Sequence, residues 1–371
     1  MKKICFIVSS PLTASSFLKG PIMELSKSFH ITLIANLNSN DSEVLNDLPL
    51  KEIHNFEIIR NISIFKDFNC LFKLIYFFYK NKFDAIHSIS PKAGLLGTLA
   101  GFISFTPKRI HTFTGQVWHT KKGVQKIILK NIDRLIVKCA TNILVDGKSQ
   151  LKFLKKKKII KNKGMILGNG SISGVEINRF TPSKNIRDDL REKYQISKDE
   201  WVFMFLGRLN KDKGVVDLIK AFNLIEQIKY RSTLYLVGND EENIKLRFGS
   251  ISPKVRFIPH KKKPEQILQI SDTFCMPSYR EGFGVSVIEA SALKIPIICS
   301  DTYGLRDTVK NGKTGLKYAV GNIFKLKETL EYSLKNKKKM IKMGEEGRKY
   351  VEKNFSHQIL IKAWKEFYSQ I

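Results

Sequence analysis

Short apolar runs alternate with segments of helical periodicity along almost the whole chain. A continuous apolar run is typical of a strand that is buried on both faces of a sheet. Strands that alternate with helices predict parallel sheets covered by helices on both sides, which is an α/β architecture. The predicted strands are residues 3–8, 29–35, 85–89, 109–114, 141–146, 164–168, 201–207, 232–238, 255–259, 273–278 and 296–300.

The predicted strands fall into two series, separated by a stretch without a clear pattern. A chain of 371 residues is too long for one hydrophobic core and fits two domains. We therefore predict two doubly wound, Rossmann-like domains that face a central cleft, because ligands bind outside the carboxyl ends of the strands in such sheets. The predicted parts are a domain over 1–168, a hinge over 169–185, a domain over 186–352 and a final helical segment over 353–371.

A glycine-rich segment, LGNGSISGVEINRF at 167–180, lies at the predicted domain boundary. Gly168 and Gly170 begin a pattern similar to a dinucleotide fingerprint, but the third glycine, Gly174, comes one position too late. No long helical pattern follows it. The segment therefore predicts a hinge, and no dinucleotide site is expected.

The composition is that of a globular protein, with 43% hydrophobic and 26% charged residues, but the formal net charge is +30. Such a charge indicates a polyanionic partner, namely nucleic acid, an anionic membrane or an acidic substrate, or else a general bias toward lysine on surface helices. Lysine runs at 152–163 and 335–342 supply part of the charge. Composition alone leaves these alternatives open.

The five cysteines form no Cys-x-x-Cys pair, and their number is odd. This pattern predicts a reduced, cytoplasmic protein without a disulfide framework or a zinc site. The apolar run at 4–8 is shorter than the core of a signal peptide, which needs at least about seven residues. The uncharged stretch 93–107 is shorter than the ~18 apolar residues of a membrane span. We therefore expect no segment that crosses a bilayer.

Two cations, Arg208 and Lys213, lie in the loop between a predicted strand and a predicted helix that begins near Gly214. The free N–H groups and the dipole at a helix N-terminus attract anions. A planar guanidinium and an ammonium group together suit a diphosphate. The alternative is an ordinary surface loop with ion pairs. The loop is not a Walker loop, because no Gly-Lys-Ser/Thr follows a GxxxxG spacing.

The stretch SYREGFGVSVIEASA, at 278–292, places two carboxylates around a glycine-containing turn. Glu281 precedes Gly282 and Gly284, and Glu289 lies about one turn into the helix that follows. The glycines allow the backbone to approach a ligand, and the helix N-terminus points at the same place. The two carboxylates can therefore bind two different sets of hydroxyls, one from a sugar and one from a ribose. The alternative is a helix N-terminus that simply favours acidic residues.

The E-x7-E spacing of Glu281 and Glu289, with GRLNKDKG at 207–214, resembles the retaining GT-B glycosyltransferases of family 4, also called glycosyltransferase group 1. The resemblance covers nearly the whole chain. It implies the GT-B fold, with an acceptor-binding N-terminal domain, a C-terminal domain that binds a nucleotide sugar, and a last helix that packs back towards the first domain. The segments similar to bacterial enzymes that build O-antigen, capsule or lipid-linked glycans are 111–123, 167–180 and 301–316.

The resemblance also implies a role for each matching residue. Arg208 and Lys213 would hold the donor diphosphate and stabilise the leaving group. Glu281 would bind donor-sugar hydroxyls and stabilise positive charge at the anomeric carbon, while Glu289 would bind the ribose. The remaining donor-binding residues, which would act through their backbone, are Gly207, Gly282, Phe283, Gly284, Val285 and, near the base, Ile258.

The resemblance implies retaining chemistry by front-face attack, in which the donor phosphate helps to remove the acceptor proton. It implies that no metal and no other cofactor is required, and the sequence contains no Asp-x-Asp. The nucleotide sugar is a substrate of such an enzyme.

Two features depart from the family pattern. The loop 9–20 lacks the glycine pair that many relatives place near phosphate, so serine side chains or a different loop shape must replace it. Thr114 lies where many relatives have a histidine near the donor sugar, between His111 and His119, and we expect these histidines to be outward-facing loop residues. Trp118 suits sugar stacking and a core position equally well. The candidates for the acceptor or sugar side are Ser16, Phe17, His111, Thr114, Gly115, Gln116, Trp118 and His119.

Segment 64–83 is rich in phenylalanine and lysine. A basic, aromatic helix can lie on an anionic bilayer, or it can pack against a sheet with its lysines in solvent. Both interpretations remain open, although a lipid-linked acceptor would favour the first. The final segment 356–371 predicts an amphipathic helix.

These features predict a glycosyltransferase that moves a hexosyl or N-acetylhexosaminyl group from a nucleotide sugar, most simply a UDP-sugar, to a glycan or lipid-linked acceptor in bacterial surface-polysaccharide synthesis. Its expected place is the cytoplasm, peripheral on the inner face of the plasma membrane. The alternatives on the same fold are a sugar-nucleotide epimerase and a phosphorylase. An alternative of another class is a non-catalytic basic protein that binds membranes or nucleic acid, but no nucleic-acid motif is present and nucleic acid is not an expected partner.

Overall fold

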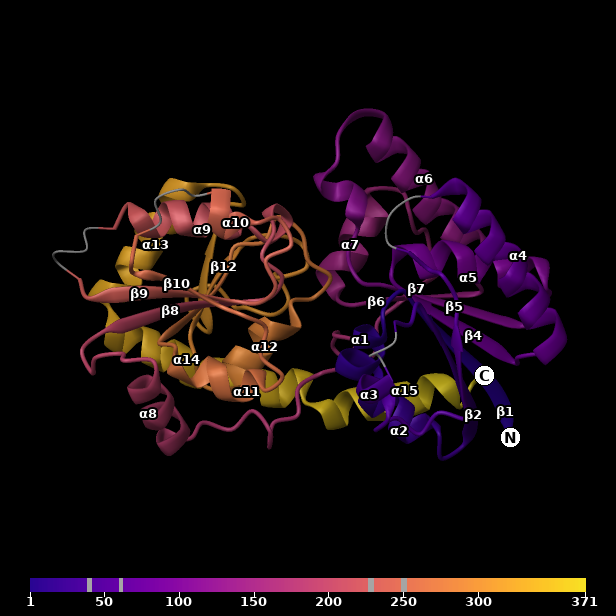
Figure 1. Cartoon of the computed structure of the whole chain (residues 1–371), viewed down its shortest axis with the longest axis horizontal. Coiled ribbons are helices and arrows are strands. Elements are labelled where there is room, and N and C mark those ends of the chain that lie inside the picture. Colours follow the sequence, from indigo (N-terminus) through magenta and orange to yellow (C-terminus); the bar gives the residue numbers. More distant parts are fainter. Residues whose placement is uncertain (39–41, 60–62, 226–229, 248–251) are drawn as a thin grey trace. The chain divides into compact units, whose positions relative to one another are not determined.

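The chain forms two compact units, each built around its own parallel sheet (Figure 1). The computed structural model describes residues 1–38, 42–59, 63–225, 230–247 and 252–371. Unit 1 comprises Met1–Gly174 and His357–Ile371, and unit 2 comprises Val175–Ser356. The chain therefore leaves unit 1 within the segment predicted as a hinge and returns to it for the last helix.

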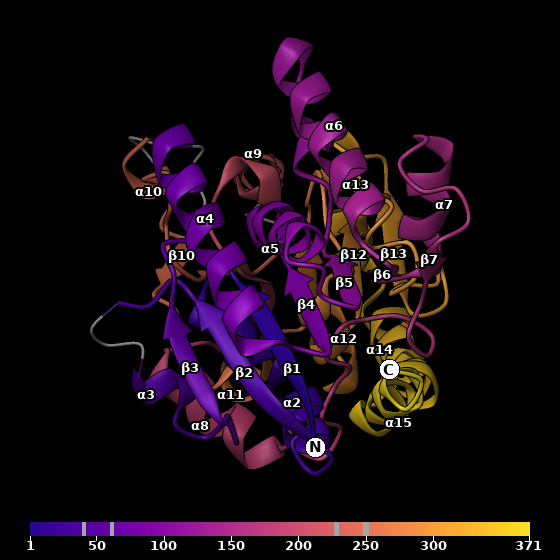
Figure 2. The same cartoon turned by 90° about the vertical axis from the view of Figure 1, so that its right-hand side faces the viewer.

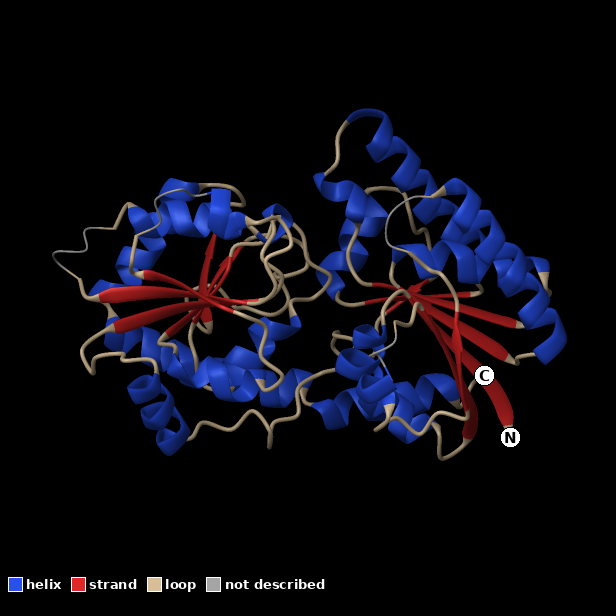
Figure 3. Ribbon diagram, in the orientation of Figure 1, coloured by secondary structure: helices blue, strands red, loops and turns tan. Residues whose placement is uncertain are grey.

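Unit 1 contains a seven-stranded sheet in the order β3-β2-β1-β4-β5-β6-β7, and all its pairings are parallel (Figure 3). The strand order reverses between β1 and β4, which makes the carboxyl ends of these two strands the switch point of the sheet. The strands are β1 (Lys2–Val8), β2 (Phe29–Ala35), β3 (Glu52–Asn55), β4 (Ala85–Ile89), β5 (Lys108–Phe113), β6 (Asn142–Val145) and β7 (Gly164–Met165).

Helices cover both faces of the unit 1 sheet (Figure 2). Side chains alternate along β1, so that Ile4, Phe6 and Val8 pack towards α2 and α15, while Cys5 and Ile7 pack towards α4 and α5. The helical segments are α1 (Pro11–Thr13), a π-helical turn (Ala14–Leu18), α2 (Lys19–Leu25), α3 (Ser42–Leu45), α4 (Ile64–Asn81), α5 (Pro91–Ile103), a 3-10 turn (Val117–Thr120), α6 (Gly123–Cys139), α7 (Lys148–Lys156) and α15 (His357–Tyr368).

The last helix, α15, completes the core of unit 1. Trp364 is fully buried, and its ring centroid lies 5.4 Å from that of His87 and 6.3 Å from that of Phe6. The hydroxyl of Tyr368 shares a hydrogen bond of 2.7 Å with Nδ1 of His87. Burial lowers the pKa of His87 to about 3, so its imidazole is neutral and sits among aromatic rings without a charge to solvate.

Unit 2 contains a six-stranded parallel sheet in the order β10-β9-β8-β11-β12-β13, with α9 and α13 on one face and α12 and α14 on the other (Figure 1). The strands are β8 (Trp201–Leu206), β9 (Ser232–Val237), β10 (Val255–Ile258), β11 (Thr273–Met276), β12 (Ile297–Ser300) and β13 (Gly315–Tyr318). The helical segments are α8 (Lys184–Lys193), a 3-10 turn (Lys211–Lys213), α9 (Val215–Asn223), α10 (Ile244–Arg247), α11 (Pro264–Ile267), a 3-10 turn (Leu268–Ile270), α12 (Val285–Ala292), α13 (Ile323–Lys335) and α14 (Lys337–Phe355).

The predicted α/β class with two parallel Rossmann-like sheets is confirmed. Every predicted strand is present, but the last strand of the first series shrinks from 164–168 to β7, Gly164–Met165. The sequence did not predict β3 and β13, because neither EIHN nor GLKY is a continuous apolar run. All five cysteines are free and buried. Among the described helices, none combines the length and the apolar character needed to span a membrane.

We predict that Trp364→Ala lowers the free energy of unfolding of unit 1 by about 3–5 kcal/mol, because it empties a space between α15 and the sheet. The measurement is thermal unfolding followed by circular dichroism. Phe324→Ala, which removes an exposed ring from α13 in unit 2, is the control and should leave the melting temperature unchanged. A Trp364→Ala protein that melts like the wild type would show that α15 contributes nothing to the core.

Candidate functional site

The predicted donor-binding residues lie at the carboxyl edge of the unit 2 sheet. β8 and β11 are neighbours there, and the strand order reverses between them. The loop after β8 leads through a 3-10 turn into α9, and the loop after β11 leads into α12. Parallel neighbouring strands bring these two loops together at the switch point, where doubly wound sheets bind their ligands.

An ion pair between Lys213 and Glu281 joins the two loops. The ammonium nitrogen Nζ lies 2.5 Å from the carboxylate oxygen Oε1, and both side chains are largely buried. Ser278 donates a hydrogen bond of 2.8 Å from Oγ to the same oxygen, which fixes the carboxylate. Asn210 accepts a hydrogen bond of 3.1 Å from the backbone N–H of Lys213 and so holds the turn that carries the lysine. The structure therefore brings together the lysine and the glutamate for which the family resemblance implies catalytic roles.

Arg208, the second predicted cation, lies at the more exposed end of the same loop. Its Nη1 lies 3.1 Å from Oε2 of Glu241, and Nδ2 of Asn210 donates to the same oxygen at 2.8 Å. Glu241 follows β9, and sequence analysis missed it. In the sequence, Glu241 stands out only as an acidic residue shortly after a predicted strand. The sequence does not show that this strand is the neighbour of the strand that precedes Arg208.

Glycines allow the backbones of the site to approach each other closely. Gly214, with φ +69°, is the N-cap of α9, and a Cβ placed there would lie 2.1 Å from the carbonyl oxygen of Pro277. A Cβ on Gly304 would lie 2.1 Å from the carbonyl oxygen of Glu281. Only glycine fits at these two positions without moving the neighbouring backbone. The segment after β12 therefore supports the Glu281 loop, a role that sequence analysis did not assign to it.

Further polar contacts tie the Glu281 loop to the loop after β8. Arg280 Nε lies 2.8 Å from Oδ2 of Asp212, and the backbone N–H of Tyr279 donates to the carbonyl oxygen of Asp212 at 2.9 Å. The Tyr279 hydroxyl donates to Asp217 in α9 at 2.6 Å. Burial, together with this carboxylate, raises the pKa of Tyr279 to about 12. These contacts fix the relative position of Lys213 and Glu281.

The residues predicted to bind the donor through their backbone differ in which of their groups a ligand can reach. Phe283 is buried and its ring packs edge-on to Phe355, with 5.1 Å between centroids, so only its backbone remains for a ligand. Gly284, with φ +72°, and Val285 form the N-terminus of α12, and Gly282 precedes them in the loop. Ile258 ends β10, and its carbonyl oxygen accepts the N–H of Gly238 at 2.9 Å.

Glu289 lies on α12 in an acidic surrounding. Burial raises the pKa of its carboxyl to about 7, although Arg179 lowers it, and Glu265 and Glu176 raise it further. Arg179 itself binds Glu265, with 2.8 Å between Nη2 and Oε2. Glu289 therefore changes between an acid and a carboxylate near neutral pH. The family resemblance implies that Glu289 binds the ribose. Its three charged neighbours are distant in the sequence, so no local pattern indicates them.

The expectation that His111 is an outward-facing loop residue is wrong. His111 lies within β5, whose last four residues are all buried, and its ring lies on the face of the sheet that α5 covers. Its Nδ1 lies 3.0 Å from Oγ of Ser88, and Gly94 leaves room for the ring, since a Cβ there would lie 2.4 Å from it. Burial lowers the pKa of His111 to about 3. Among the other candidates of unit 1, Gly115 and Gln116 are buried, Phe17, Thr114 and His119 are partly exposed, and Ser16 is exposed.

Trp118 is a core residue. Its indole stacks on Phe153 with 5.4 Å between centroids, and its Nε1 donates to Oδ2 of Asp133 at 2.6 Å. Burial raises the pKa of Asp133 to about 7. His119, at the end of the same 3-10 turn, packs edge-on to Phe153 at 5.0 Å. Of the two interpretations of Trp118, the structure therefore favours the core position.

The loop after β1, which lacks the glycine pair of many relatives, is largely helical. After Ser9 and Ser10 the chain enters α1 at Pro11 and continues through the π-helical turn that contains Ser16 and Phe17. Ser9 Oγ lies 2.7 Å from Oγ of Ser90, which links the ends of β1 and β4 at the switch point of unit 1. Helical structure and a pair of serine hydroxyls therefore both occur in this loop.

Comparison with known proteins identifies the family. Residues 186–350 match the family model described as "Glycosyl transferases group 1". The chain is 34% identical over 340 residues to a capsular polysaccharide biosynthesis glycosyltransferase, CapM, of Staphylococcus aureus, covering 90% of this chain and 86% of the relative. It is 26% identical over 308 residues to a UDP-Gal:alpha-D-GlcNAc-diphosphoundecaprenol alpha-1,3-galactosyltransferase of Escherichia coli, covering 80% of this chain and 78% of the relative.

A solved structure shows the same fold over the whole chain. The structure of Anabaena HepE in complex with UDP-glucose has a TM-score of 0.82 and 16% identity, covering 100% of both chains. This chain therefore belongs to the group 1 glycosyltransferases and has the GT-B fold. The interpretation as a glycosyltransferase is confirmed at this level. Within the described part of the chain, no group of three or more His, Cys, Asp or Glu residues is arranged to hold a metal ion.

We predict that Gly214→Ala destabilises unit 2 by more than about 2 kcal/mol, because the new methyl group meets the Pro277 carbonyl in a strained backbone. Gly312→Ala is the matched control: its φ is +74°, but its Cβ position is open, so only the backbone strain of about 1 kcal/mol remains. Urea unfolding of both variants measures the difference. Equal losses would contradict the close approach of the two loops.

We predict that Glu289→Gln is more stable than the wild type at pH 8 by about 1–3 kcal/mol, and that the difference disappears near pH 4. The folded pKa of about 7 lies above that of an unfolded glutamate, so ionising Glu289 costs stability as the pH rises from the unfolded value to the folded one. Urea unfolding at a series of pH values gives the profile. A constant difference across the series would show that Glu289 titrates normally.

Proposed function

We propose that this glycosyltransferase moves a sugar from a UDP-sugar to a lipid-linked saccharide, with retention of anomeric configuration. The observation that supports the proposal most is the pair of Lys213 and Glu281, 2.5 Å apart at the switch point of the unit 2 sheet. A cation and a carboxylate in contact suit a donor that presents a diphosphate next to a sugar, because each group has a partner of the appropriate charge or polarity.

Lys213 and Arg208 neutralise the donor diphosphate. The ammonium group of Lys213 moves from Glu281 to a phosphate oxygen, while Arg208 exchanges Glu241 for the other phosphate. The N–H groups at the starts of α9 and α12, next to Gly214 and Gly284, add to this anion site. As the glycosidic bond breaks, these groups stabilise the negative charge on the departing UDP, so no metal ion is needed for that purpose.

Glu281 acts on the sugar. Ser278 holds one of its oxygens, and the carboxylate accepts hydrogen bonds from sugar hydroxyls and stabilises the positive charge that develops at the anomeric carbon. The acceptor oxygen attacks from the face that the phosphate leaves. Its proton passes to the departing phosphate oxygen as the new carbon–oxygen bond forms, so the configuration at carbon is retained.

Glu289 and the end of β10 hold the nucleoside. The Glu289 carboxylate accepts hydrogen bonds from the ribose hydroxyls, and a pKa of about 7 makes this contact sensitive to pH. The base lies beside Ile258 and is bound by backbone groups. The Ile258 carbonyl retains an acceptor lone pair besides the one that Gly238 uses. We propose UDP as the nucleotide because the name of one relative mentions UDP-Gal and the description of one structural neighbour mentions UDP-glucose.

The acceptor is a diphosphate-linked lipid that carries a sugar. Two relatives are named for such acceptors: the Escherichia coli galactosyltransferase, and a Campylobacter jejuni N-acetylgalactosaminyltransferase, 26% identical over 313 residues, that acts on N,N'-diacetylbacillosaminyl-diphospho-undecaprenol. The transferred group is accordingly a hexosyl or an N-acetylhexosaminyl group. The acceptor contacts unit 1 near Ser16, Phe17, Thr114 and His119, which keep some exposure at the carboxyl edge of its sheet.

The product belongs to a bacterial surface polysaccharide of the capsule or O-antigen type, as in the S. aureus relative, whose name places it in capsule synthesis. The enzyme works in the cytoplasm and reaches its acceptor as a peripheral protein on an anionic membrane.

We predict that Lys213→Ala and Glu281→Ala each lower kcat with the correct donor by about 10²–10³-fold, because each removes a group that stabilises charge in the transition state. The assay follows UDP release from a panel of UDP-, GDP- and dTDP-sugars in the presence of EDTA, with a lipid-linked acceptor. Lys211→Ala, an exposed lysine of the same 3-10 turn, is the matched control and should retain wild-type activity.

Two results would contradict the proposal. Full activity of both variants would remove Lys213 and Glu281 from the chemistry. Loss of all activity in EDTA, restored by a divalent cation, would contradict charge neutralisation by Lys213 and Arg208 alone.

A further inference from the structure

The outer surface of α4 is unusually apolar for a helix at the edge of a unit. Phe65, Phe72, Tyr76 and Tyr79 are 91%, 66%, 68% and 70% exposed, and Phe68 is exposed between them. At 3.6 residues per turn these five aromatic side chains share one stripe along the helix. The residues that α4 buries in the core, Cys70, Leu74 and Phe78, lie on the opposite side. The aromatic stripe therefore lies on the side of α4 opposite the core of unit 1.

A row of lysines runs beside the aromatic stripe. Lys66, Lys73 and Lys80 follow each other at intervals of seven residues, which is about two turns, so they lie on one flank of α4. Lys66 is paired with Glu57 at 2.6 Å, whereas Lys73 and Lys80 make no ion pair with any residue that the structure describes. The helix therefore combines exposed rings with cations that are available to an external anion.

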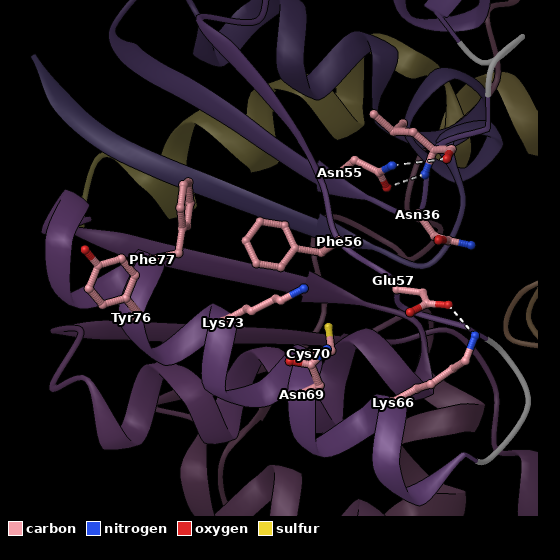
Figure 4. A pocket seen from close by; sticks show the side chains of 11 residues that line it. Asn36, Asn55, Phe56, Glu57, Lys66, Asn69, Cys70, Lys73, Tyr76 and Phe77 are labelled. Atoms are coloured by element: carbon pink, nitrogen blue, oxygen red, sulfur yellow. Dashed lines mark hydrogen bonds and ion pairs between the residues drawn. The ribbon is translucent and has the colours of Figure 1, made fainter.

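A pocket opens on the lysine flank of α4 (Figure 4). It has a volume of about 570 Å³ and lies between α4 and the ends of β2 and β3. Lys66, Lys73 and Tyr76 line it from the helix, and Asn36 and Phe56 line it from the strand ends. It is far in the sequence from Lys213 and Glu281 and belongs to unit 1. The pocket is large enough for the polar head group of a lipid that lies next to the aromatic stripe.

Two neighbouring helices also expose apolar residues. α4 packs beside α5, and α5 packs beside α6, on one face of the unit 1 sheet (Figure 2). The end of α5 exposes Phe102 and Ile103, and Phe105 follows. The first turns of α6 expose Val124 and Ile127. The exposed basic residues of α6 are Lys126, Arg134 and Lys138.

The acidic residues of this region do not compensate its positive charge. Between residues 64 and 139 they are Asp67, Asp84 and Asp133, and each has a partner within unit 1; Glu57, which lines the pocket, is paired with Lys66. Asp67 pairs with Lys92 at 2.5 Å, Asp84 accepts the N–H of Lys3 at 2.7 Å, and Asp133 accepts the Trp118 N–H at 2.6 Å. The surface is therefore aromatic and cationic, which is complementary to a bilayer with anionic head groups and apolar chains.

We propose that α4 lies in the plane of an anionic bilayer, with its aromatic stripe at the level of the acyl chains and its lysine row at the lipid phosphates. Tyrosine is enriched at membrane–water interfaces, phenylalanine is typical of the buried face of an interfacial helix, and lysine side chains reach from that depth to the head groups. α5 and α6 contribute the exposed residues named above to the same contact. The inference rests on the peripheral membrane location in the proposed function and names the surface responsible for it.

The test is sedimentation of the full-length protein with phosphatidylglycerol vesicles and with phosphatidylcholine vesicles, without any sugar donor. We expect the wild type to bind the anionic vesicles more strongly. Phe65→Ser/Phe72→Ser should lower binding to them by at least about tenfold, because it removes buried apolar area. Phe324→Ser, which removes a 74% exposed ring from unit 2, should leave binding unchanged.

The charge is tested separately. Lys73→Gln/Lys80→Gln should lower binding to phosphatidylglycerol vesicles by at least about tenfold at low salt and weaken the salt dependence. The control is Lys338→Gln/Lys339→Gln, which removes two exposed lysines of α14 and should change neither.

Three results would overturn the inference: no binding of the wild type to phosphatidylglycerol vesicles, equal binding of the α4 variants, or a wild-type dimer that the Phe65→Ser/Phe72→Ser variant no longer forms. UDP binding by each protein, measured by calorimetry, separates this test from that of the proposed function. A protein that binds UDP but not vesicles would contradict only the membrane surface, and one that binds vesicles but no nucleotide would contradict only the donor site.

Discussion

The close approach of two loop backbones is the constraint on which the candidate site depends. Gly214 faces the Pro277 carbonyl, and Gly304 faces the carbonyl of Glu281, at distances that exclude any side chain. The loops after β8 and β11 are thereby held against each other at the edge where the strand order reverses. Lys213 and Glu281 come from these loops, so their contact of 2.5 Å follows from the backbone arrangement. A charged pair built this way is positioned before any ligand arrives, which is the condition for effective electrostatic stabilisation.

The two glutamates of the E-x7-E spacing in unit 2 have different charged neighbours. Glu281 has a lysine and a serine hydroxyl as partners, whereas Glu289 lies near Glu265 and Glu176 with a single arginine, Arg179, close by. The E-x7-E spacing thus places one carboxylate against a cation and the other in an environment that favours the protonated form. The two carboxyl groups therefore lie in different surroundings, and we propose a different role for each, one on the reacting sugar and one on the ribose.

Sequence patterns predicted most of the fold because buried parallel strands are continuous apolar runs, which are local features. β3 escaped prediction because it is short and largely exposed. The site was predicted in part: Lys213 and Glu281 were found from their places between a strand and a helix, but Glu241, Ser278 and Gly304 depend on which strands are neighbours. His111 was misjudged although it lies within the predicted strand 109–114, because its burial depends on α5, which packs on that face of the sheet and leaves space for the imidazole at Gly94.

The central claim is that the donor diphosphate binds where the loops after β8 and β11 meet. Hydrogen–deuterium exchange of the protein with and without UDP tests it most directly, because it reports on backbone N–H groups along the chain. The account predicts that UDP slows exchange in 208–216 and 280–288, next to Lys213 and Gly284, and leaves the strands of unit 1 unchanged. Unchanged exchange in both segments while UDP is bound, or protection confined to unit 1, would contradict it.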